Sequence, residues 1–348
     1  MRHKYAGKQA LFIGIALFCS FYAFSLAYAL DEQITDKYVS ALPSPQQEAK
    51  EQAFAPRPGG KMKVTGFVDI QQGYDNNVDL DSNRFKDGFL QTTANIDTAY
   101  SFTETFKFRG GADYFQTIYY KHNKNNLSDV SPYIGFDYEF MPGVVSRNRF
   151  IFDYFSYPNE KENTFTGIVL SSYIRQYFCD YIFHEAGYEY LRRWYPDRAT
   201  FDDNGFYGLF DRADERYRMK YNLGFIFPRA FFTLSNEFQI NDSNDKYQEY
   251  YDYSLYRLKP SVIFFLRDDL YTDIGLLYKY TAYKDRRSTE NSDKKERDNT
   301  FLFNVSVYYE FMKNVTLGIT YSYSENISND PFQKYSGSIL SGGLYYSF

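Results

Sequence analysis

The sequence has no apolar run after residue 29 that is long enough for a transmembrane helix, which needs roughly 18 consecutive apolar residues. It also has few cysteines, tryptophans and histidines, with 2, 1 and 3 of each among 348 residues. The mean hydropathy is −0.55. A membrane protein built from helices is therefore excluded. A membrane β-barrel is not, because only every second residue of a spanning strand must be apolar.

Basic residues are outnumbered by acidic ones. The chain has 39 Lys and Arg against 44 Asp and Glu, a formal net charge of −5. Residues 1–29 carry three cations and no acid, so their removal moves the charge from −5 to −8. Nucleic-acid binders are basic, and this balance argues against nucleic acid as a partner.

The first 29 residues have the pattern of a secretory signal peptide. A basic start, "MRHKYAGK", precedes an apolar stretch that ends in Ala27-Tyr28-Ala29. Small residues at this spacing predict cleavage after Ala29. The mature chain then keeps only Cys179, so an internal disulfide is excluded.

Residues 30–60 are rich in Pro, Gln and Glu and poor in strand formers. This composition predicts a flexible periplasmic arm. Three roles stay open for it: a plain linker, a plug in the lumen of a barrel, and a docking peptide for a periplasmic partner.

From residue 61 to residue 348 the sequence is rich in aromatic residues, with 38 Tyr and 35 Phe in the whole chain, and it alternates between apolar and polar positions. In "NTFLFNVSVYYEFM", residues 299–312, the large apolar residues fall on one parity. Such alternation predicts strands with one apolar face. About fourteen strands can be placed, each longer than the five or six residues usual in soluble proteins. Pro132, Pro260 and the charges Arg257 and Lys259 interrupt two of them, so the count could lie between 12 and 16.

The connections between these strands alternate between short turns and long polar loops. This asymmetry is typical of a transmembrane antiparallel up-and-down β-barrel. The sequence therefore predicts an all-β barrel at 61–348 in the outer membrane of a Gram-negative bacterium, in contact with lipid and lipopolysaccharide. The long loops at 195–215 and 284–298 are predicted to gate it.

The chain ends in "SILSGGLYYSF", an alternating strand that runs to its last residue. It resembles the C-terminal signal of bacterial outer-membrane proteins, at Leu340, Leu344, Tyr346 and Phe348. The resemblance implies recognition by the barrel assembly machinery. A closed barrel would pair this strand with the first, so that neither edge is left open.

The residues predicted to face the lumen include charges of both signs. A solvated lumen with paired charges and a charged constriction that selects solutes are both consistent with this set. The candidates are Lys107, Arg109, Asp113, Asp137, Glu139, Arg147, Arg149, Asp153, Arg175, Glu185, Glu189, Arg193, Arg218, Lys220, Glu237, Lys279 and Glu310.

Catalytic and metal-binding signals are weak. The mature chain keeps His122 and His184, and neither has a Ser or Asp at a spacing that sets both on one face. The acids in "DNNVDLDSN", residues 75–83, lack the glycine turn and closing Glu of a calcium loop. The sequence thus predicts no enzyme, no cofactor and no metal site.

A short motif at the end of the first strand carries a further resemblance. "GYDNNV", Gly73 to Val78, resembles the Gly-Tyr-Asp-x-Asn-Val motif of a loose group of outer-membrane barrels. The group includes the C-terminal barrel of surface lipoprotein assembly modifiers and porins encoded with exopolysaccharide systems. The resemblance covers residues 61–348 and implies an outer-membrane barrel of about this size.

Three functions remain open from the sequence. The leading hypothesis is a channel for hydrophilic solutes or an exported polymer. The second is an assembly or secretion barrel that exports surface lipoprotein or exopolysaccharide with periplasmic partners. The third is a structural or adhesive barrel with a blocked lumen.

Overall fold

The computed structural model describes residues 62–80, 84–202, 204–247, 250–289 and 293–348. The predicted signal peptide at 1–29 and the predicted arm at 30–60 lie outside these residues. Among the described residues, no helix is both long and apolar enough to cross a membrane.

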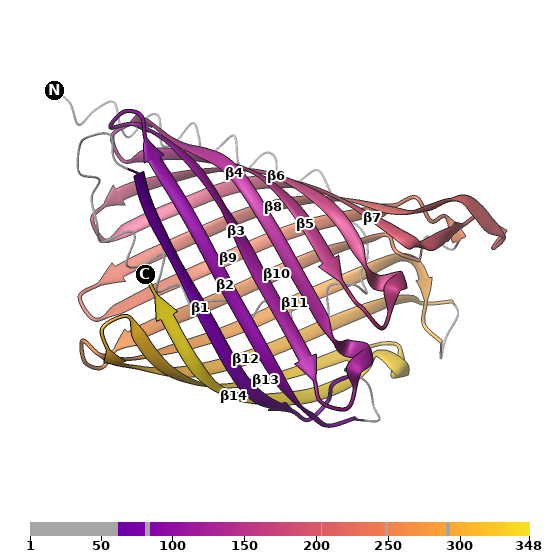
Figure 1. Ribbon diagram of the computed structural model, residues 1–348. Helices are drawn as coiled ribbons and strands as arrows, with labels where there is room; N and C mark the ends of the chain where they lie inside the picture. Colours follow the sequence, from indigo (N-terminus) through magenta and orange to yellow (C-terminus); the bar gives the residue numbers. More distant parts are fainter. Residues whose placement is uncertain (1–61, 81–83, 203, 248–249, 290–292) are drawn as a thin grey trace.

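Fourteen antiparallel strands form one closed barrel in which each strand pairs with its neighbours in sequence and β1 pairs with β14 (Figure 1). This confirms the predicted fold class and strand number. The strands are β1 Met62–Asp75, β2 Asp87–Ser101, β3 Phe106–Tyr119, β4 Leu127–Met141, β5 Val144–Ser156, β6 Phe165–Cys179, β7 Ile182–Phe201, β8 Tyr207–Phe227, β9 Ala230–Ser243, β10 Tyr253–Phe265, β11 Leu270–Arg287, β12 Lys295–Met312, β13 Val315–Ser328 and β14 Tyr335–Ser347. Single turns of 3-10 helix lie in three of the loops: η1 Asn123–Asn125, η2 Lys161–Asn163 and η4 Pro331–Gln333.

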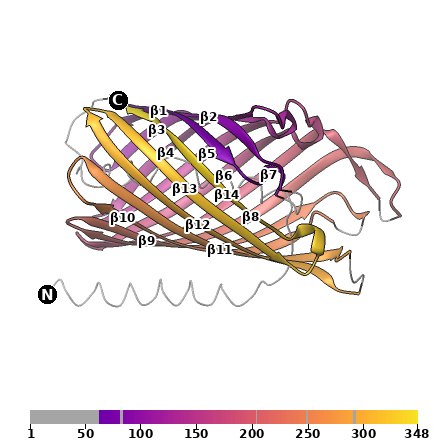
Figure 2. The ribbon, with the colours of Figure 1, turned by 90° about the horizontal axis from the view of Figure 1, so that it is seen from below.

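The two rims of the barrel differ. The short turns and the start of β1 lie at one rim, as does the C-terminus, which we call the short-turn rim. The opposite rim carries the long loops, and β7 and β8 project beyond it (Figure 2). In outer-membrane barrels the short turns are periplasmic.

The sequence predicts long gating loops at 195–215 and 284–298, and this prediction is wrong over most of both ranges. The strands β7 and β8 leave only residues 202–206 between them, and β11 and β12 leave only 288–294. Charged residues do not end a strand that lies in water, because ladder hydrogen bonds still satisfy its backbone. These segments therefore form paired ribbons above the rim.

The two prolines are accommodated inside strands without a change of register. In the β4–β5 ladder the pairs step from Val130–Tyr154 to Tyr133–Ile151, and Pro132 lies in the gap. Pro260 lies in a similar gap of the β10–β11 ladder. Proline lacks the N–H that a ladder bond requires, so each strand loses bonds on one side only.

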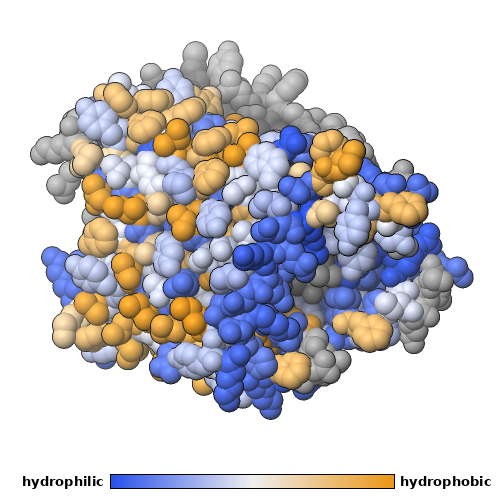
Figure 3. Space-filling view, turned by 45° about the vertical axis from the view of Figure 1, so that its right-hand side comes forward, coloured by the Kyte–Doolittle hydropathy of each residue, from blue (hydrophilic) through white to orange (hydrophobic). Residues whose placement is uncertain are grey.

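Apolar side chains cover the outside of the barrel. Aliphatic residues such as Ile134, Leu276 and Ile319 are 51–57% exposed there. Aromatic residues surround the barrel near the short-turn rim, at Tyr100, Phe102, Tyr138, Phe140, Phe178, Tyr309, Phe311, Tyr346 and Phe348. Figure 3 shows that apolar residues gather over one part of this surface, beside a strongly polar zone. An apolar band with an aromatic girdle is the surface that a bilayer requires.

The last strand closes the barrel against the first. Residues Phe67–Asp75 pair with Ile339–Ser347, and Phe348 exchanges two backbone hydrogen bonds with Gly66, of 3.0 and 3.1 Å. Leu340, Leu344, Tyr346 and Phe348, the predicted assembly signal, all face outward and are about half exposed.

Deletion of Phe348 removes the two bonds that it shares with Gly66 and the last ring of the girdle. We expect a loss of about 1–3 kcal/mol in the free energy of unfolding, and a larger loss of barrel assembled in cells. The measurement is the heat-modifiable fraction on gels, from outer membranes and after refolding in detergent. The conservative variant Phe348→Tyr is the control. Normal assembly of the deletion in cells would contradict the proposed signal.

Candidate functional site

The inner wall of the barrel carries a band of ion pairs that involves nine neighbouring strands. It starts on β2, where Asp97 accepts a 2.8 Å bond from Arg109 of β3. Arg109 also binds Asp137 of β4, at 2.7 Å, and Asp137 binds Arg149 of β5, at 2.9 Å. These side chains share a face because each lies directly or diagonally across the ladder from the next.

The band continues through two glutamates of β7. Glu185 binds Arg175 of β6, at 2.8 Å, and lies 3.7 Å from Arg147 of β5. Glu189 binds Lys220 at 3.0 Å and Arg218 at 3.3 Å, both on β8. Each carboxylate is thus held between two cations.

The band ends on β10. Glu237 of β9 lies 3.9 Å from both Arg218 and Lys220 and forms an ion pair with Arg257. We call the whole band the charge ladder. Its members are Asp97, Arg109, Asp137, Arg147, Arg149, Arg175, Glu185, Glu189, Arg218, Lys220, Glu237 and Arg257.

The charge ladder is only partly removed from solvent. The side chains of Arg147 and Lys220 are 29% and 25% exposed, whereas that of Arg175 is 2% exposed. The long cationic side chains on β5 and β8 therefore present their charge to the lumen, while Arg175 is held against the wall, with its guanidinium 4.5 Å from the ring centre of Phe183.

The remaining predicted lumen residues lie elsewhere. Asp113 accepts a 2.8 Å bond from Asn95 and is opposite Ser131 in the β3–β4 register. Asp153 is opposite Gly167 in the β5–β6 register. Lys279 is fully buried on β11. Glu310 lies at the short-turn rim and accepts a 3.3 Å bond from the Asn314 backbone.

Three other candidates flank the ladder. Lys107 is opposite Asp137 in the β3–β4 register, and Glu139 accepts a 2.9 Å bond from the Gly143 backbone at the turn. Arg193 is buried, with its guanidinium 4.1 Å from the ring centre of Phe165.

Sequence reasoning missed two members of the charge ladder. Arg257 was interpreted as an interruption of its strand, but it faces inward and pairs with Glu237. Asp97 was not singled out among the inward residues. The signal for both was parity: each alternates with outward apolar residues, Ile96 beside Asp97 and Tyr256 beside Arg257.

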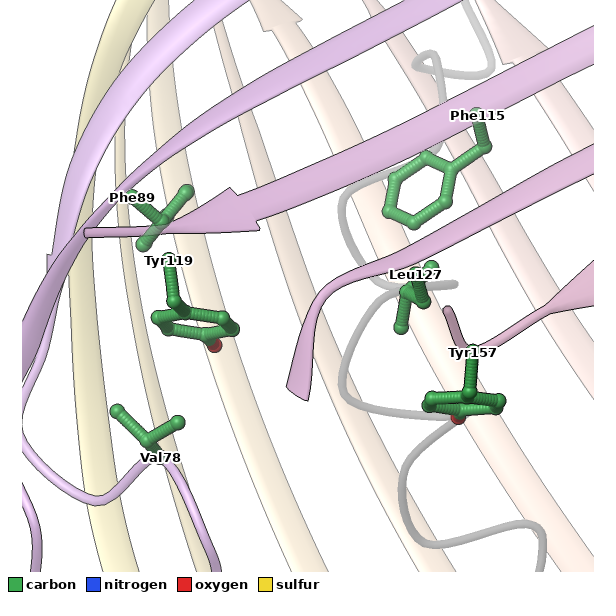
Figure 4. Close-up of a cluster of buried hydrophobic side chains, with 6 residues drawn as sticks. All are labelled: Val78, Phe89, Phe115, Tyr119, Leu127 and Tyr157. Carbon is green, nitrogen blue, oxygen red and sulfur yellow. The ribbon is translucent and has the colours of Figure 1, made fainter. Parts of the chain in front are cut away.

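The motif at Gly73–Val78 has a structural explanation. A Cβ on Gly73 would lie 2.3 Å from the ring of Phe89, so that ring packs directly over the glycine. Asp75 accepts bonds from the Tyr119 hydroxyl, at 2.8 Å, and from the Asn77 backbone, at 2.9 Å. Val78 is thereby placed in an apolar cluster with Phe89, Phe115, Tyr119, Leu127 and Tyr157 at the long-loop end (Figure 4).

The acids that follow this motif are held by protein groups. Asp79 pairs with Lys124 at 3.0 Å and accepts a 2.6 Å bond from Asn125. Asp81 lies outside the described residues. Within the described part of the chain, no group of three or more His, Cys, Asp or Glu is arranged to hold a metal ion.

Asp330 ties two loops together at the long-loop rim. Its carboxylate accepts bonds from the Thr289 backbone and hydroxyl, at 2.9 and 2.7 Å, and from the Phe332 backbone, at 2.9 Å. Burial by itself would raise the pKa of this carboxyl, but the hydrogen bonds from Thr289 and Phe332 outweigh it and hold the pKa below its usual value. The ionised carboxylate of Asp330 therefore stabilises the contact between the two loops.

No known protein-family model matches the chain, and no curated protein matches it in sequence. Solved structures resemble it in fold. In vitro folded OmpT of Vibrio cholerae has a TM-score of 0.52 at 9% identity, over 83% of this chain and 98% of that one. The outer membrane channel DcaP of Acinetobacter baumannii has a TM-score of 0.50 at 10% identity, over 85% and 99%. Identity this low shows the fold alone, which is that of outer-membrane β-barrels.

These comparisons correct one prediction. The sequence predicts that the chain is not an enzyme, and this prediction is wrong because the comparisons do not exclude an enzyme. The similar structures include OmpT of Vibrio cholerae both folded in vitro and expressed in the outer membrane, and at 9–10% identity a shared fold excludes no activity. Spacing along the sequence was also a poor criterion, because catalytic groups are defined by their geometry and not by their position in the chain.

Replacement of Glu189 by glutamine tests the charge ladder. The change leaves Arg218 and Lys220 facing each other with one carboxylate fewer between them. We expect the free energy of unfolding to fall by about 1–3 kcal/mol, since these groups are only partly buried. The measurement is urea unfolding in detergent, with Glu162→Gln in an exposed loop as the matched control. Equal stability of the two variants would show that the ladder contributes nothing to the fold.

Replacement of Asp330 by asparagine tests the loop clamp. Because the pKa of Asp330 is lowered, its contribution to stability is present above the ordinary pKa, about 3.9, and is lost as pH falls through its lowered value. The melting temperature of the wild type should exceed that of Asp330→Asn at pH 7, and the difference should shrink towards pH 3. Asp180→Asn, at an exposed turn on the other rim, is the control. A difference independent of pH would contradict the clamp.

Proposed function

We propose that the chain forms a channel for small hydrophilic solutes across the outer membrane, with the charge ladder as its constriction. One observation carries the proposal: charged side chains from nine consecutive strands, β2 to β10, face the inside of a closed barrel. A barrel of this width need not be filled by its own side chains. The fold likeness to DcaP, described as an outer membrane channel, supports the same function.

The order of charges along the lumen suggests how a solute is selected. On the long-loop side of the ladder, Asp113, Asp129 and Asp153 lie on the neighbouring strands β3, β4 and β5. A solute that enters from outside meets this acidic surface first and the charge ladder second. Acidic surfaces favour cations, and the ladder then offers both signs.

Within the ladder, cations outnumber acids. The cations are Arg109, Arg147, Arg149, Arg175, Arg218, Lys220 and Arg257, and the acids are Asp97, Asp137, Glu185, Glu189 and Glu237. Such a band holds polar solutes by several weak contacts rather than one strong one. Passage requires this, because a solute bound too tightly would not leave.

The pair Glu237–Arg257 allows a matched test of the channel. Glu237→Gln should shift the reversal potential in a salt gradient towards anions, and Arg257→Gln should shift it towards cations. The measurement is conductance in planar bilayers, made on residues 30–348 and on the barrel alone, residues 62–348. Asp180→Asn at an exposed turn is the control.

Two results would contradict the channel. One is the absence of current from both chains when gels show that both are folded. This would favour the structural or adhesive barrel, or an exporter that needs its partners. The other is a shift of the same sign for both variants, which would mean that ions do not pass the ladder.

A further inference from the structure

Two exposed tyrosines mark the upper end of the apolar outer wall on β1, β2 and β3, close to the long-loop rim. Tyr74 of β1 is opposite Gly88 of β2, and the Tyr120 N–H, just beyond β3, donates a 3.0 Å bond to the Gly88 carbonyl. Tyr74 and Tyr120 are 50% and 55% exposed. Leu90 and Ile118, which pair one step lower, also face outward. We call Tyr74 and Tyr120 the upper aromatic row.

The upper aromatic row is about one bilayer thickness away from the girdle at the short-turn rim. Strand β2 carries both levels, with Gly88 at the row and Tyr100 in the girdle. At about 3.3 Å per residue and a strand tilt of roughly 40°, this stretch of β2 rises about 30 Å along the barrel axis. The hydrocarbon core of a bilayer has the same thickness, about 30 Å. Groups beyond the row therefore lie at the level of the lipid headgroups of the outer leaflet.

Three exposed cations lie directly beyond the upper aromatic row. Lys86 is the residue before β2, and Lys121 follows Tyr120 in the chain. Arg84 donates a 2.8 Å hydrogen bond to the Ser336 hydroxyl, which places its guanidinium beside the start of β14. We call Arg84, Lys86 and Lys121 the outer cationic patch.

The described acids of this region do not neutralise the outer cationic patch. Asp79 pairs with Lys124, at 3.0 Å. Asp87 is buried, and its carboxylate accepts backbone bonds from Lys121 and His122, at 2.7 and 2.8 Å. The buried carboxylate therefore fixes the backbone that carries Lys121 and leaves the lysine side chain exposed. Among the described residues, the charge exposed above the row is positive.

We propose that the outer cationic patch binds the phosphate groups of phosphorylated lipid headgroups in the outer leaflet. The order of the rows supports a lipid as the partner, since apolar, aromatic and cationic side chains follow one another in the order of acyl chain, interface and headgroup. A soluble anion would need only the cations. The guanidinium of Arg84 suits two oxygens of one phosphate, and the two lysines act as point charges. The patch lies outside the lumen, so this inference goes beyond the proposed channel.

Binding of fluorescently labelled diphosphoryl lipid A tests the patch, with residues 30–348 folded in a neutral detergent. The triple variant Arg84→Gln, Lys86→Gln and Lys121→Gln removes all three cations. Each cation near an anionic lipid surface contributes about fivefold in affinity, so we expect the triple variant to bind about a hundredfold more weakly. Each single variant should bind about fivefold more weakly.

A second triple variant is the matched control. Lys63→Gln, Arg229→Gln and Lys313→Gln remove the same charge from exposed positions at the short-turn rim and should leave the affinity unchanged. Heat-modifiable mobility on gels shows whether each variant is folded. If the patch triple variant does not fold, the single variants Lys86→Gln and Lys121→Gln carry the test.

Two further probes separate a lipid from a soluble anion. Lipid A without its phosphates should bind the wild type and the patch variant equally. Inorganic phosphate and soluble polyphosphate, at the same phosphate concentration as the labelled lipid, should not displace it.

Three results would overturn the proposal. One is equal affinity of the wild type and the folded patch variants for diphosphoryl lipid A. Another is an equal loss in the patch and control variants, which would show that net charge alone decides binding. The third is displacement of the lipid by soluble polyphosphate at equal phosphate, which would show an anion site that does not need the membrane.

Discussion

The structure depends on one constraint, which is that no backbone N–H or C=O can remain unpaired in the hydrocarbon of a bilayer. A sheet meets this requirement only when its first and last strands pair. Here β1 and β14 do so over residues Phe67–Asp75 and Ile339–Ser347. Closure in turn separates an outer face, which meets lipid, from an inner face, which is free to carry charge.

This separation explains why polar and apolar side chains are so strictly sorted. Every second residue is assigned to one face by the geometry of a strand, so the same stretch of chain supplies both the girdle and the charge ladder. In the charge ladder, Glu185 and Glu189 each lie between two cations, which offsets the repulsion between like charges on adjacent strands. On the short-turn side of the charge ladder, the inner wall carries a buried apolar cluster that includes Phe183, Phe231 and Tyr271.

Much of this could be predicted from the sequence. Alternation and loop asymmetry gave the barrel and its fourteen strands, because both are local patterns. Parity also placed Arg109, Arg149 and Arg218 on the inner wall. The strand ends could not be predicted in the same way, since polar residues above the membrane continue a ladder as readily as they end it. For this reason the strands β7, β8, β11 and β12 extend into the ranges that were predicted as loops.

The pairing of charges was also beyond the sequence, because it depends on register. A shift of two residues would place different carboxylates beside Arg257 while keeping every residue on its face. The buried cluster that contains Phe183, Phe231, Tyr271 and Tyr308, with Tyr345 packed against it, shows the same limit. Its members were visible as aromatic residues, but only the register brings Phe183, Tyr271 and Tyr345 from distant strands to one level of the lumen.

The central claim is that a closed barrel surrounds an aqueous, charge-lined lumen. It is tested most directly by swelling of liposomes that contain residues 62–348, in neutral sugars of increasing size. The account predicts rapid swelling with the smallest sugar and a steep decline with size, set by the width at the charge ladder. A folded barrel that gives no swelling with any sugar would contradict it.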